Sequence, residues 1–228
     1  MDFLKGRKDL GNVNIEKEWK CILTEEEINK CVQECARVIN DKFEGKDIVL
    51  TCILKGAAYF LVDLSRELII PHSIYFIEAS SYHDSQKQEN IEILSLIIPE
   101  KFKDKHVILL DELFDNGNTL ENVKKAIHEK ANVPLEKIFT CTLLKKNKIS
   151  SREQPDLYGL IVPDVWLVGY GLDDQQHKRG WKCVFACPKA KNIMETQDDK
   201  IFTNMYYYAR VKHDINDQID DFSEQSSL

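Results

Sequence analysis

The sequence lacks any apolar run close to the roughly 18 residues that a membrane-spanning helix requires. Lys55, Asp63 and Arg66 interrupt its most apolar stretch. Its start, MDFLKGRKDLGN, has neither the apolar core of a secretory signal nor the Arg-rich, acid-poor character of a transit peptide. We therefore expect a cytoplasmic protein with no membrane partner.

An excess of positive charge is also lacking. The chain has 31 Lys and Arg residues against 38 Asp and Glu residues, which gives a net charge of -7. This balance argues against nucleic acid as the main partner. Any phosphate group that the protein binds must be held by a local arrangement of donors.

Cysteine pairs at the tight spacing of a zinc site are absent. The chain has seven cysteines, an odd number, and no secretory signal, so neither a disulfide framework nor structural zinc is expected.

Alternating strands and helices dominate what is present. With 228 residues, of which 43% are hydrophobic, the chain suits one globular domain. Apolar periodicity predicts helices, and short apolar runs predict strands. The expected helices are 24–43, 57–68 and 119–130; the expected strands are 72–79, 91–98, 106–110, 137–144, 165–172, 181–187 and DIVLTCIL at 47–54. Uniformly apolar strands of this kind indicate a mostly parallel twisted sheet with helices on both faces, an α/β fold.

Two segments stand outside this alternation. Residues 80–90, SSYHDSQKQEN, are polar enough for an exposed loop, which suits either a binding lid or a plain hairpin connection. Residues 213–228 are acidic and poor in large apolar side chains, and we expect a disordered tail there.

Polar residues follow four of the expected strands, where ligands bind in open α/β sheets. The segments are 54–56, 111–119, 145–146 and 173–174. In the second segment a strand leads through Gly117 into a helix, whose unpaired N–H groups can hold an anion. A simple helix cap explains this turn equally well, but it does not explain Asp111 and Glu112, adjacent acids that need ribose hydroxyls or a divalent cation as partners.

VILLDELFDNGNTL resembles the phosphoribosyl pyrophosphate (PRPP) motif of type I phosphoribosyltransferases. Further segments resemble the hypoxanthine-guanine (6-oxopurine) branch in the same order: ILKGAAYFLVDL, SSYHD, LLKK, and PDVWLVGYGLDD followed by Arg179. The resemblance covers about residues 49–184. The acids stand in the order Asp-Glu instead of Glu-Asp, and Asn116 replaces the common Thr or Ser, so we expect weaker or rearranged phosphate binding. The GLDD segment is more similar to divergent protozoan, guanine-preferring members.

The resemblance implies a single phosphoribosyltransferase domain over 1–228. Its core would span about 45–170, and the N-terminal segment with about 171–205 would form a small hood. The implied reaction belongs to purine salvage: guanine or hypoxanthine displaces pyrophosphate from PRPP, giving GMP or IMP. A homodimer is also expected.

The resemblance further implies a role for individual residues. Asp115 is the candidate catalytic base. The ribose-phosphate contacts are Asp111, Glu112, Asn116, Gly117, Asn118 and Thr119; the pyrophosphate contacts are Lys55, Gly56 and Arg179; the purine contacts are Lys145, Trp166, Leu167 and Asp173; the mobile loop is Ser81 and Tyr82; and the Mg²⁺ ligands are Asp173, Asp111 and Glu112. Asp174 is interpreted as a solvated surface charge.

Two other functions stay open. A phosphoribosyltransferase for another base, such as xanthine, would share every motif above. A non-catalytic regulator that binds PRPP or nucleotides would keep the fold without releasing pyrophosphate.

Overall fold

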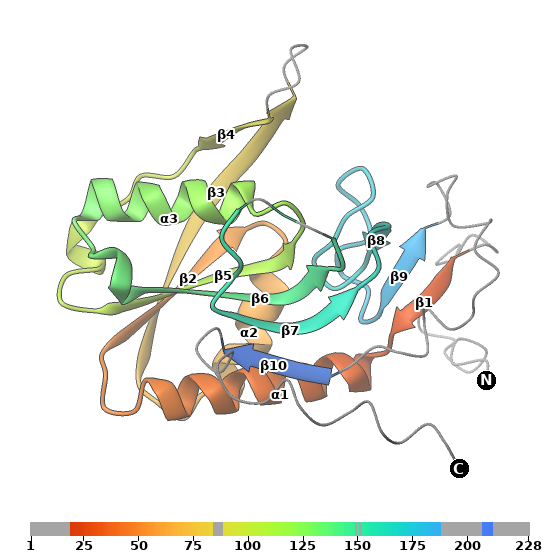
Figure 1. Cartoon of the computed structure of the whole chain (residues 1–228), viewed down its shortest axis with the longest axis horizontal. Helices are drawn as coiled ribbons and strands as arrows, with labels where there is room; N and C mark the ends of the chain where they lie inside the picture. Colours follow the sequence, from red (N-terminus) through yellow and green to blue (C-terminus); the bar gives the residue numbers. More distant parts are fainter. Residues whose placement is uncertain (1–18, 84–88, 149, 151, 188–206, 212–228) are drawn as a thin grey trace.

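The computed structural model describes residues 19–83, 89–148, 150, 152–187 and 207–211 (Figure 1). Its main feature is a seven-stranded sheet of order β10-β7-β6-β5-β2-β3-β4. The strands are β2 (Ile48–Leu54), β3 (His72–His83), β4 (Glu89–Ile93), β5 (His106–Phe114), β6 (Ile138–Lys146), β7 (Leu157–Val162) and β10 (Tyr207–Val211). The five inner strands are parallel, while β4 and β10 pair antiparallel at the two edges. This confirms the expected α/β fold.

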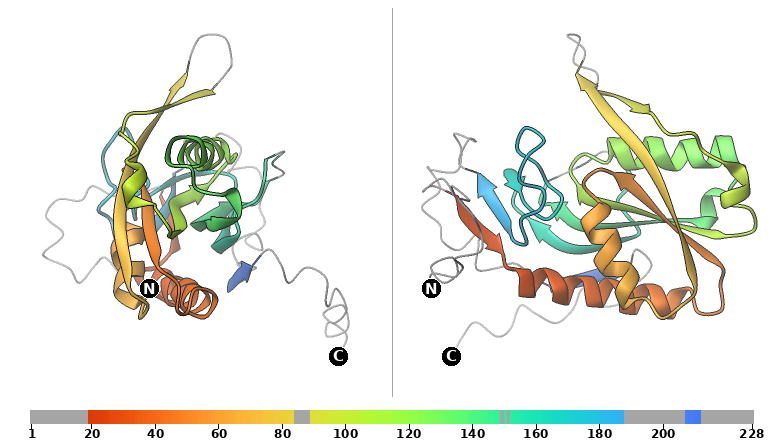
Figure 2. Two further views of the ribbon diagram at one scale, coloured as in Figure 1. Left: turned by 90° about the vertical axis from the view of Figure 1, so that its left-hand side faces the viewer. Right: turned by 180° about the vertical axis from the view of Figure 1, so that it is seen from behind.

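Helices cover both faces of this sheet (Figure 2). α1 (Glu25–Lys42) and α2 (Ala58–Glu67) lie on one face, and α3 (Asn118–Ala131) lies on the other. Two short 3-10 turns, Pro99–Lys101 and Leu135–Lys137, precede β5 and β6. A buried apolar cluster fills the space on each face of the sheet. In the part of the chain described, no helix has the length and apolar character needed to cross a bilayer.

The start of α1 follows from local sequence. Thr24 accepts a hydrogen bond from the Glu27 N–H, and the Glu27 carboxylate accepts one from the Thr24 N–H. This reciprocal pair satisfies two groups that a helix terminus otherwise leaves unpaired. The helix therefore begins where the Thr24 and Glu27 spacing predicts.

The structure also contains a second, three-stranded sheet of order β1-β9-β8. Its strands are β1 (Lys20–Leu23), β8 (Trp166–Val168) and β9 (Val184–Cys187). β8 thus pairs outside the central sheet, although the expected core extends to about residue 170. The expected tail, 213–228, lies outside the described residues.

The polar segment from residue 80, for which a lid and a plain hairpin connection were both open, is partly a hairpin. β3 continues through Ser81 and Tyr82, which pair with Ile91 and Asn90. Antiparallel backbone pairing with β4 explains why this polar stretch is extended. The remaining part, 84–88, lies outside the described residues.

Candidate active site

The candidate site lies where β2, β5 and β6 end, at the same edge of the parallel sheet (Figure 1). Asp111 and Glu112 are the last acidic residues within β5, and Asp111 is only 9% exposed. Among the described residues, neither carboxylate forms an ion pair with a lysine or arginine. A buried acid beside a partly buried one, with no cation to pair with, is costly, and their position at the strand end indicates a ligand-binding role.

Burial raises the pKa of both carboxyl groups above their usual range. The charge of Glu112 raises the pKa of Asp111 further. The Glu112 N–H donates to Asp111 Oδ1 at 3.0 Å, which opposes this rise only in part. A ligand that supplies hydroxyl donors or positive charge would therefore be bound more tightly by the ionised pair.

Gly56, after β2, packs directly against the acidic pair. A Cβ atom at this position would lie 1.9 Å from Glu112 Oε1. Gly171 lies in the loop after β8, and a Cβ atom there would lie 2.1 Å from the Gly56 carbonyl oxygen. The two glycine backbones are therefore in close contact. The Leu54–Lys55 peptide bond is cis, and Lys55 is exposed. The expected pyrophosphate loop therefore lies beside the expected ribose-binding acids.

The turn from β5 into α3 has the geometry expected of an anion cradle. Gly117 is the N-cap residue with φ 83°, a conformation that favours glycine, and no side chain caps the helix. Asp115 is therefore not the helix cap. Asn116 Oδ1 accepts from the Asn118 N–H at 2.9 Å, so its side chain occupies one of the donors expected to meet phosphate. Thr119 lies in the first turn of α3.

Asp115 is held between two lysines. Lys146 Nζ donates to Asp115 Oδ2 at 3.0 Å, and Lys148 forms a second ion pair with Asp115. Both lysines also lie within 4 Å of Asp164 Oδ1. Burial alone would raise the pKa of Asp115, but the hydrogen bonds from Lys148 and Lys146 bring it below its usual value. The carboxylate is thus ionised and already partnered.

The two lysines at the end of β6 make different contacts. Successive strand residues point to opposite faces, so Lys145 and Lys146 cannot both face Asp115. Lys146 contacts Asp115, whereas Lys145 Nζ lies over the Tyr158 ring, 5.1 Å from its centroid. Partial burial lowers the pKa of Lys145. Of the two, Lys146 is the one that contacts Asp115 in this structure, and the purine contact expected of Lys145 stays a prediction.

The loop after β8 brings Asp173 and Arg179 together. Arg179 Nη2 lies 2.7 Å from Asp173 Oδ1, and Arg179 Nη1 donates to the Gly171 carbonyl at 2.6 Å. The charge of Arg179 also lowers the pKa of Glu112, although burial outweighs it. The expected pyrophosphate clamp is therefore adjacent to the acidic pair.

Asp174 is not the solvated surface charge that its sequence suggests. Its side chain is 12% exposed and pairs with Lys178 at 2.8 Å. Lys178 Nζ in turn lies 3.9 Å from the Trp19 ring centroid. The ion pair between Asp174 and Lys178 spans the short backbone β-bridge between Asp174 and His177. Together these contacts fix the loop that carries Asp173.

The two expected base contacts on β8 differ in exposure. Trp166 is 51% exposed, so its ring is available to a ligand, whereas Leu167 is buried. A core tryptophan would be buried, and this exposure favours the binding role over the packing role.

Sequence reasoning assigned no role to Lys146, Lys148 or Asp164, although it included Lys146 in the polar segment 145–146. All three follow or end strands at the same sheet edge, which is the signal that could have identified them. What the sequence did not provide was the side of β6 on which each lysine projects.

The donors at this site suit Mg²⁺ held jointly with a substrate. Among the described residues, no group of three His, Cys, Asp or Glu side chains could hold a metal ion alone. Asp111 and Glu112 supply hard oxygen donors without a cationic partner, and Mg²⁺ is commonly bound by one or two carboxylates plus substrate phosphates. Asp173 is already engaged by Arg179.

Comparisons with known proteins point to one family. The phosphoribosyl transferase domain model matches residues 18–175. The hypoxanthine phosphoribosyltransferase of Salmonella typhimurium is 31% identical over 162 residues, covering 69% of this chain and 89% of that protein. The hypoxanthine-guanine phosphoribosyltransferase of Lactococcus lactis is 30% identical over 162 residues, covering 70% and 86%.

Solved structures agree with these sequence relatives. A crystal structure of a hypoxanthine-guanine phosphoribosyltransferase from Bacillus anthracis superposes with a TM-score of 0.62 at 28% identity. The match covers 73% of this chain and 96% of that chain.

Proposed function

Because the chain belongs to the phosphoribosyl transferase domain family, we propose that it is a purine-salvage enzyme of the hypoxanthine-guanine type. It transfers the phosphoribosyl group of PRPP to N9 of hypoxanthine or guanine. The products are IMP or GMP and pyrophosphate. The observation that carries the proposal is the pair of the buried Asp111 and the partly buried Glu112 beside the start of α3, which no side chain caps.

These residues match the two ends of a ribose 5-phosphate group. The carboxylates accept hydrogen bonds from the ribose hydroxyls, and their negative charge stabilises the cationic ribosyl centre of the transition state. The N–H groups between Asp115 and Thr119 hold the 5-phosphate at the helix N-terminus. For the phosphate to contact the Asn118 N–H, the Asn116 side chain must first give up its hydrogen bond to that group. This is how we interpret the rearranged phosphate binding expected from the sequence.

Lys146 and Asp115 recognise the purine. An ammonium group has only donors, so Lys146 suits the 6-oxo group and leaves adenine's 6-amino group unpaired. Asp115, ionised with a lowered pKa, accepts a hydrogen bond from N7–H more readily than it removes a proton. Trp166 stacks on the base, and the carbonyls of Leu167 and Asp173 meet its 2-position.

Lys55, Gly56 and Arg179 hold the leaving pyrophosphate. Arg179 offers a guanidinium fork to phosphate oxygens while remaining paired with Asp173. When bound, Mg²⁺ would neutralise charge on the pyrophosphate, held by Asp111 or Glu112, with Asp173 as a further candidate ligand. We infer that the β3 and β4 hairpin, which contains Ser81 and Tyr82, closes over the site during the reaction and then excludes water.

The chain also carries the apolar surface that a homodimer requires. Ile74 and Phe76 share one face of β3, and both are exposed, as are Leu94 and Leu96 beyond β4. Leu96 is 79% exposed. Exposed apolar side chains on neighbouring segments favour an interface, and a second copy of the chain is the partner that we propose. A cytoplasmic location stays a prediction.

Pyrophosphate release tests the function. Purified protein is mixed with PRPP, Mg²⁺ and one of guanine, hypoxanthine, xanthine or adenine, and pyrophosphate and nucleotide are quantified. We expect turnover with guanine and hypoxanthine, little with xanthine, none with adenine, and none in excess chelator. Turnover confined to xanthine would support the alternative base, and PRPP binding without pyrophosphate would support a regulator.

A further inference from the structure

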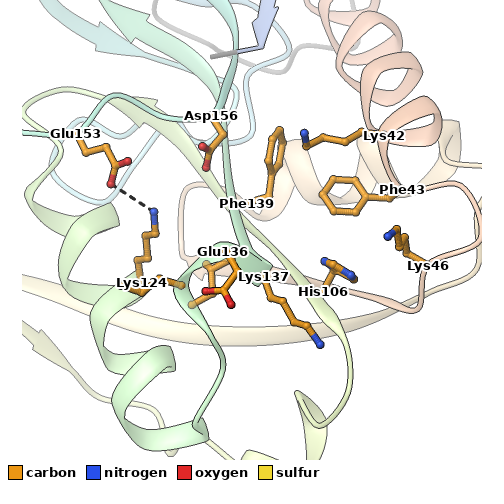
Figure 3. Close-up of a pocket in the computed structure, with 12 residues that line it drawn as sticks. Lys42, Phe43, Lys46, His106, Lys124, Glu136, Lys137, Phe139, Glu153 and Asp156 are labelled. Carbon is orange, nitrogen blue, oxygen red and sulfur yellow. Dashed lines mark hydrogen bonds and ion pairs between the residues drawn. The ribbon is translucent and has the colours of Figure 1, made fainter. Parts of the chain in front are cut away.

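A cavity of about 690 Å³ lies at the opposite edge of the central sheet from the candidate active site (Figure 3). It forms where β5 begins at His106 and β6 begins at Ile138, beside the end of α1. Small-molecule sites commonly measure about 300 to 1,000 Å³. The cavity is thus large enough for a nucleotide-sized ligand. None of the residues that line it has a role in the candidate active site.

Its floor is apolar and aromatic. Phe43 packs edge-on against Phe139, with ring centroids 5.4 Å apart, and against His106 at 5.8 Å. Leu135 adds a side chain that is 47% exposed. Lys42 Nζ lies 5.4 Å from the centroid of the Phe139 ring, so its stem extends this surface. A flat apolar group would find contact area here.

Its rim is basic. Lys42, Lys46 and Lys137 line the cavity, and none of them has an ion-pair partner among the described residues. The neighbouring acids are largely engaged, as Figure 3 shows for Glu153, which pairs with Lys124 at 3.4 Å. Asp156 accepts from the Thr140 N–H and hydroxyl at 2.8 and 2.7 Å, which leaves Glu136 as the one lining acid without such a contact in the described structure.

His106 fits the same chemistry. Burial, Lys46 and Lys137 lower its pKa, so near neutral pH it is an uncharged ring that can donate one hydrogen bond. Lys46 and Lys137, whose charges produce part of this effect, line the same cavity as His106.

We propose that this cavity binds a phosphorylated small molecule with a flat apolar part, of the nucleoside polyphosphate class. Lys42, Lys46 and Lys137 contact the phosphates. The ring part lies against Leu135 and the Phe139 edge. The site is independent of the proposed transferase reaction, because none of its residues contacts the candidate active site.

Binding is tested with ATP and with inorganic triphosphate as probes, using the full chain. The readout is the His106 ring signal in NMR titrations, assigned with His106→Gln, because that signal reports this cavity and not the PRPP site. We expect ATP to shift it in a saturable manner, with triphosphate binding several-fold more weakly because it lacks the ring.

The double variant Lys46→Gln/Lys137→Gln should weaken ATP binding tenfold or more. The matched control Lys30→Gln/Lys125→Gln removes the same charge from exposed helix positions outside the cavity and should bind as the wild type does. Unchanged thermal melting of both variants excludes a folding defect. Equal binding by the two double variants, an unmoved His106 signal, or equal affinity for triphosphate and ATP would each overturn the proposal.

Discussion

Lys146 and Asp115, 31 residues apart in the chain, are joined by a 3.0 Å hydrogen bond across the ends of β5 and β6. Each supplies what one edge of a 6-oxopurine needs: the ammonium group donates to O6, and the carboxylate accepts from N7–H. The pair is held in place before any base arrives. In the function that we propose, this ion pair preorganises the purine site, and Lys148 and Asp164 balance its charge.

The two adjacent lysines give the sharpest test of the purine contact. We expect Lys146→Gln to lower kcat/KM for guanine and hypoxanthine together, on the order of tenfold to a hundredfold, because it removes the charged donor to O6. Lys145→Gln is the matched control and should have little effect, since Lys145 faces Tyr158. Steady-state kinetics with both bases measure this. A larger loss from Lys145→Gln would return the role to that residue.

Asp115→Asn separates base recognition from PRPP binding. We expect kcat to fall on the order of a hundredfold, because the amide cannot accept from N7–H while it also faces two lysines. PRPP affinity should stay nearly unchanged, since Gly117 and not Asp115 begins α3. Single-turnover rates and PRPP titration give the two quantities. A parallel loss of PRPP affinity would place Asp115 in the phosphate cradle instead.

The acidic pair should lower stability as the pH rises. Because the pKa of Asp111 is raised in the folded state, folding favours its protonated form, and stability is lost as pH rises from the ordinary aspartate range toward that raised pKa. Asp111→Asn keeps the acceptor for the Glu112 N–H and removes the charge. We expect a gain of about 1 kcal/mol or more near neutral pH, which shrinks toward pH 4, together with a large loss of turnover.

Thermal melting of wild type and Asp111→Asn between pH 4 and pH 8 checks this prediction. Glu100→Gln, an exposed acid on the turn before β5, serves as the control and should shift the melting temperature little at any pH. A melting difference for Asp111→Asn that is independent of pH would show that ionisation is not its cause.

Sequence patterns were sufficient for some elements and insufficient for others. The strand, turn and helix from His106 to Ala131 are evident because the strand is uniformly apolar and a turn glycine follows. β7 was not predicted because Gly159 interrupts its pattern. The structure supplies the reason, since a Cβ there would lie 2.0 Å from Cys31 Sγ on α1.

In the site, too, sequence patterns predict the position of some residues and not of others. Asp111, Glu112 and Gly117 lie at a strand end or helix start that the sequence pattern specifies, whereas Arg179 lies in the loop between β8 and β9. The choice between Lys145 and Lys146 depends on which side of β6 faces Asp115. The burial of Asp174 depends on the packing of Trp19 and Lys178. Such long-range contacts leave no periodic signal.

Phe76 should be required for dimerisation. Phe76→Glu places a charge on the exposed apolar face of β3, where burial against a second copy would cost several kcal/mol. We expect the wild type to sediment as a dimer and the variant as a monomer with unchanged secondary structure. Glu67→Gln, at the end of α2, is a control away from β3. A wild-type monomer at all concentrations would contradict the proposed interface.

Gly56→Ala should disable the site through a single methyl group. The new Cβ would lie 1.9 Å from Glu112 Oε1, and the neighbouring Gly171 already contacts the Gly56 carbonyl, so neither side can yield without moving the acidic pair or the loop that carries Arg179. We expect kcat/KM for PRPP to fall a hundredfold or more, with a measurable loss of stability. Gly180→Ala is the matched control, because its Cβ would meet only the Tyr59 hydroxyl at an ordinary 3.6 Å. Comparable activity of the two variants would show that the contact between Gly56 and Glu112 does not position the acidic pair.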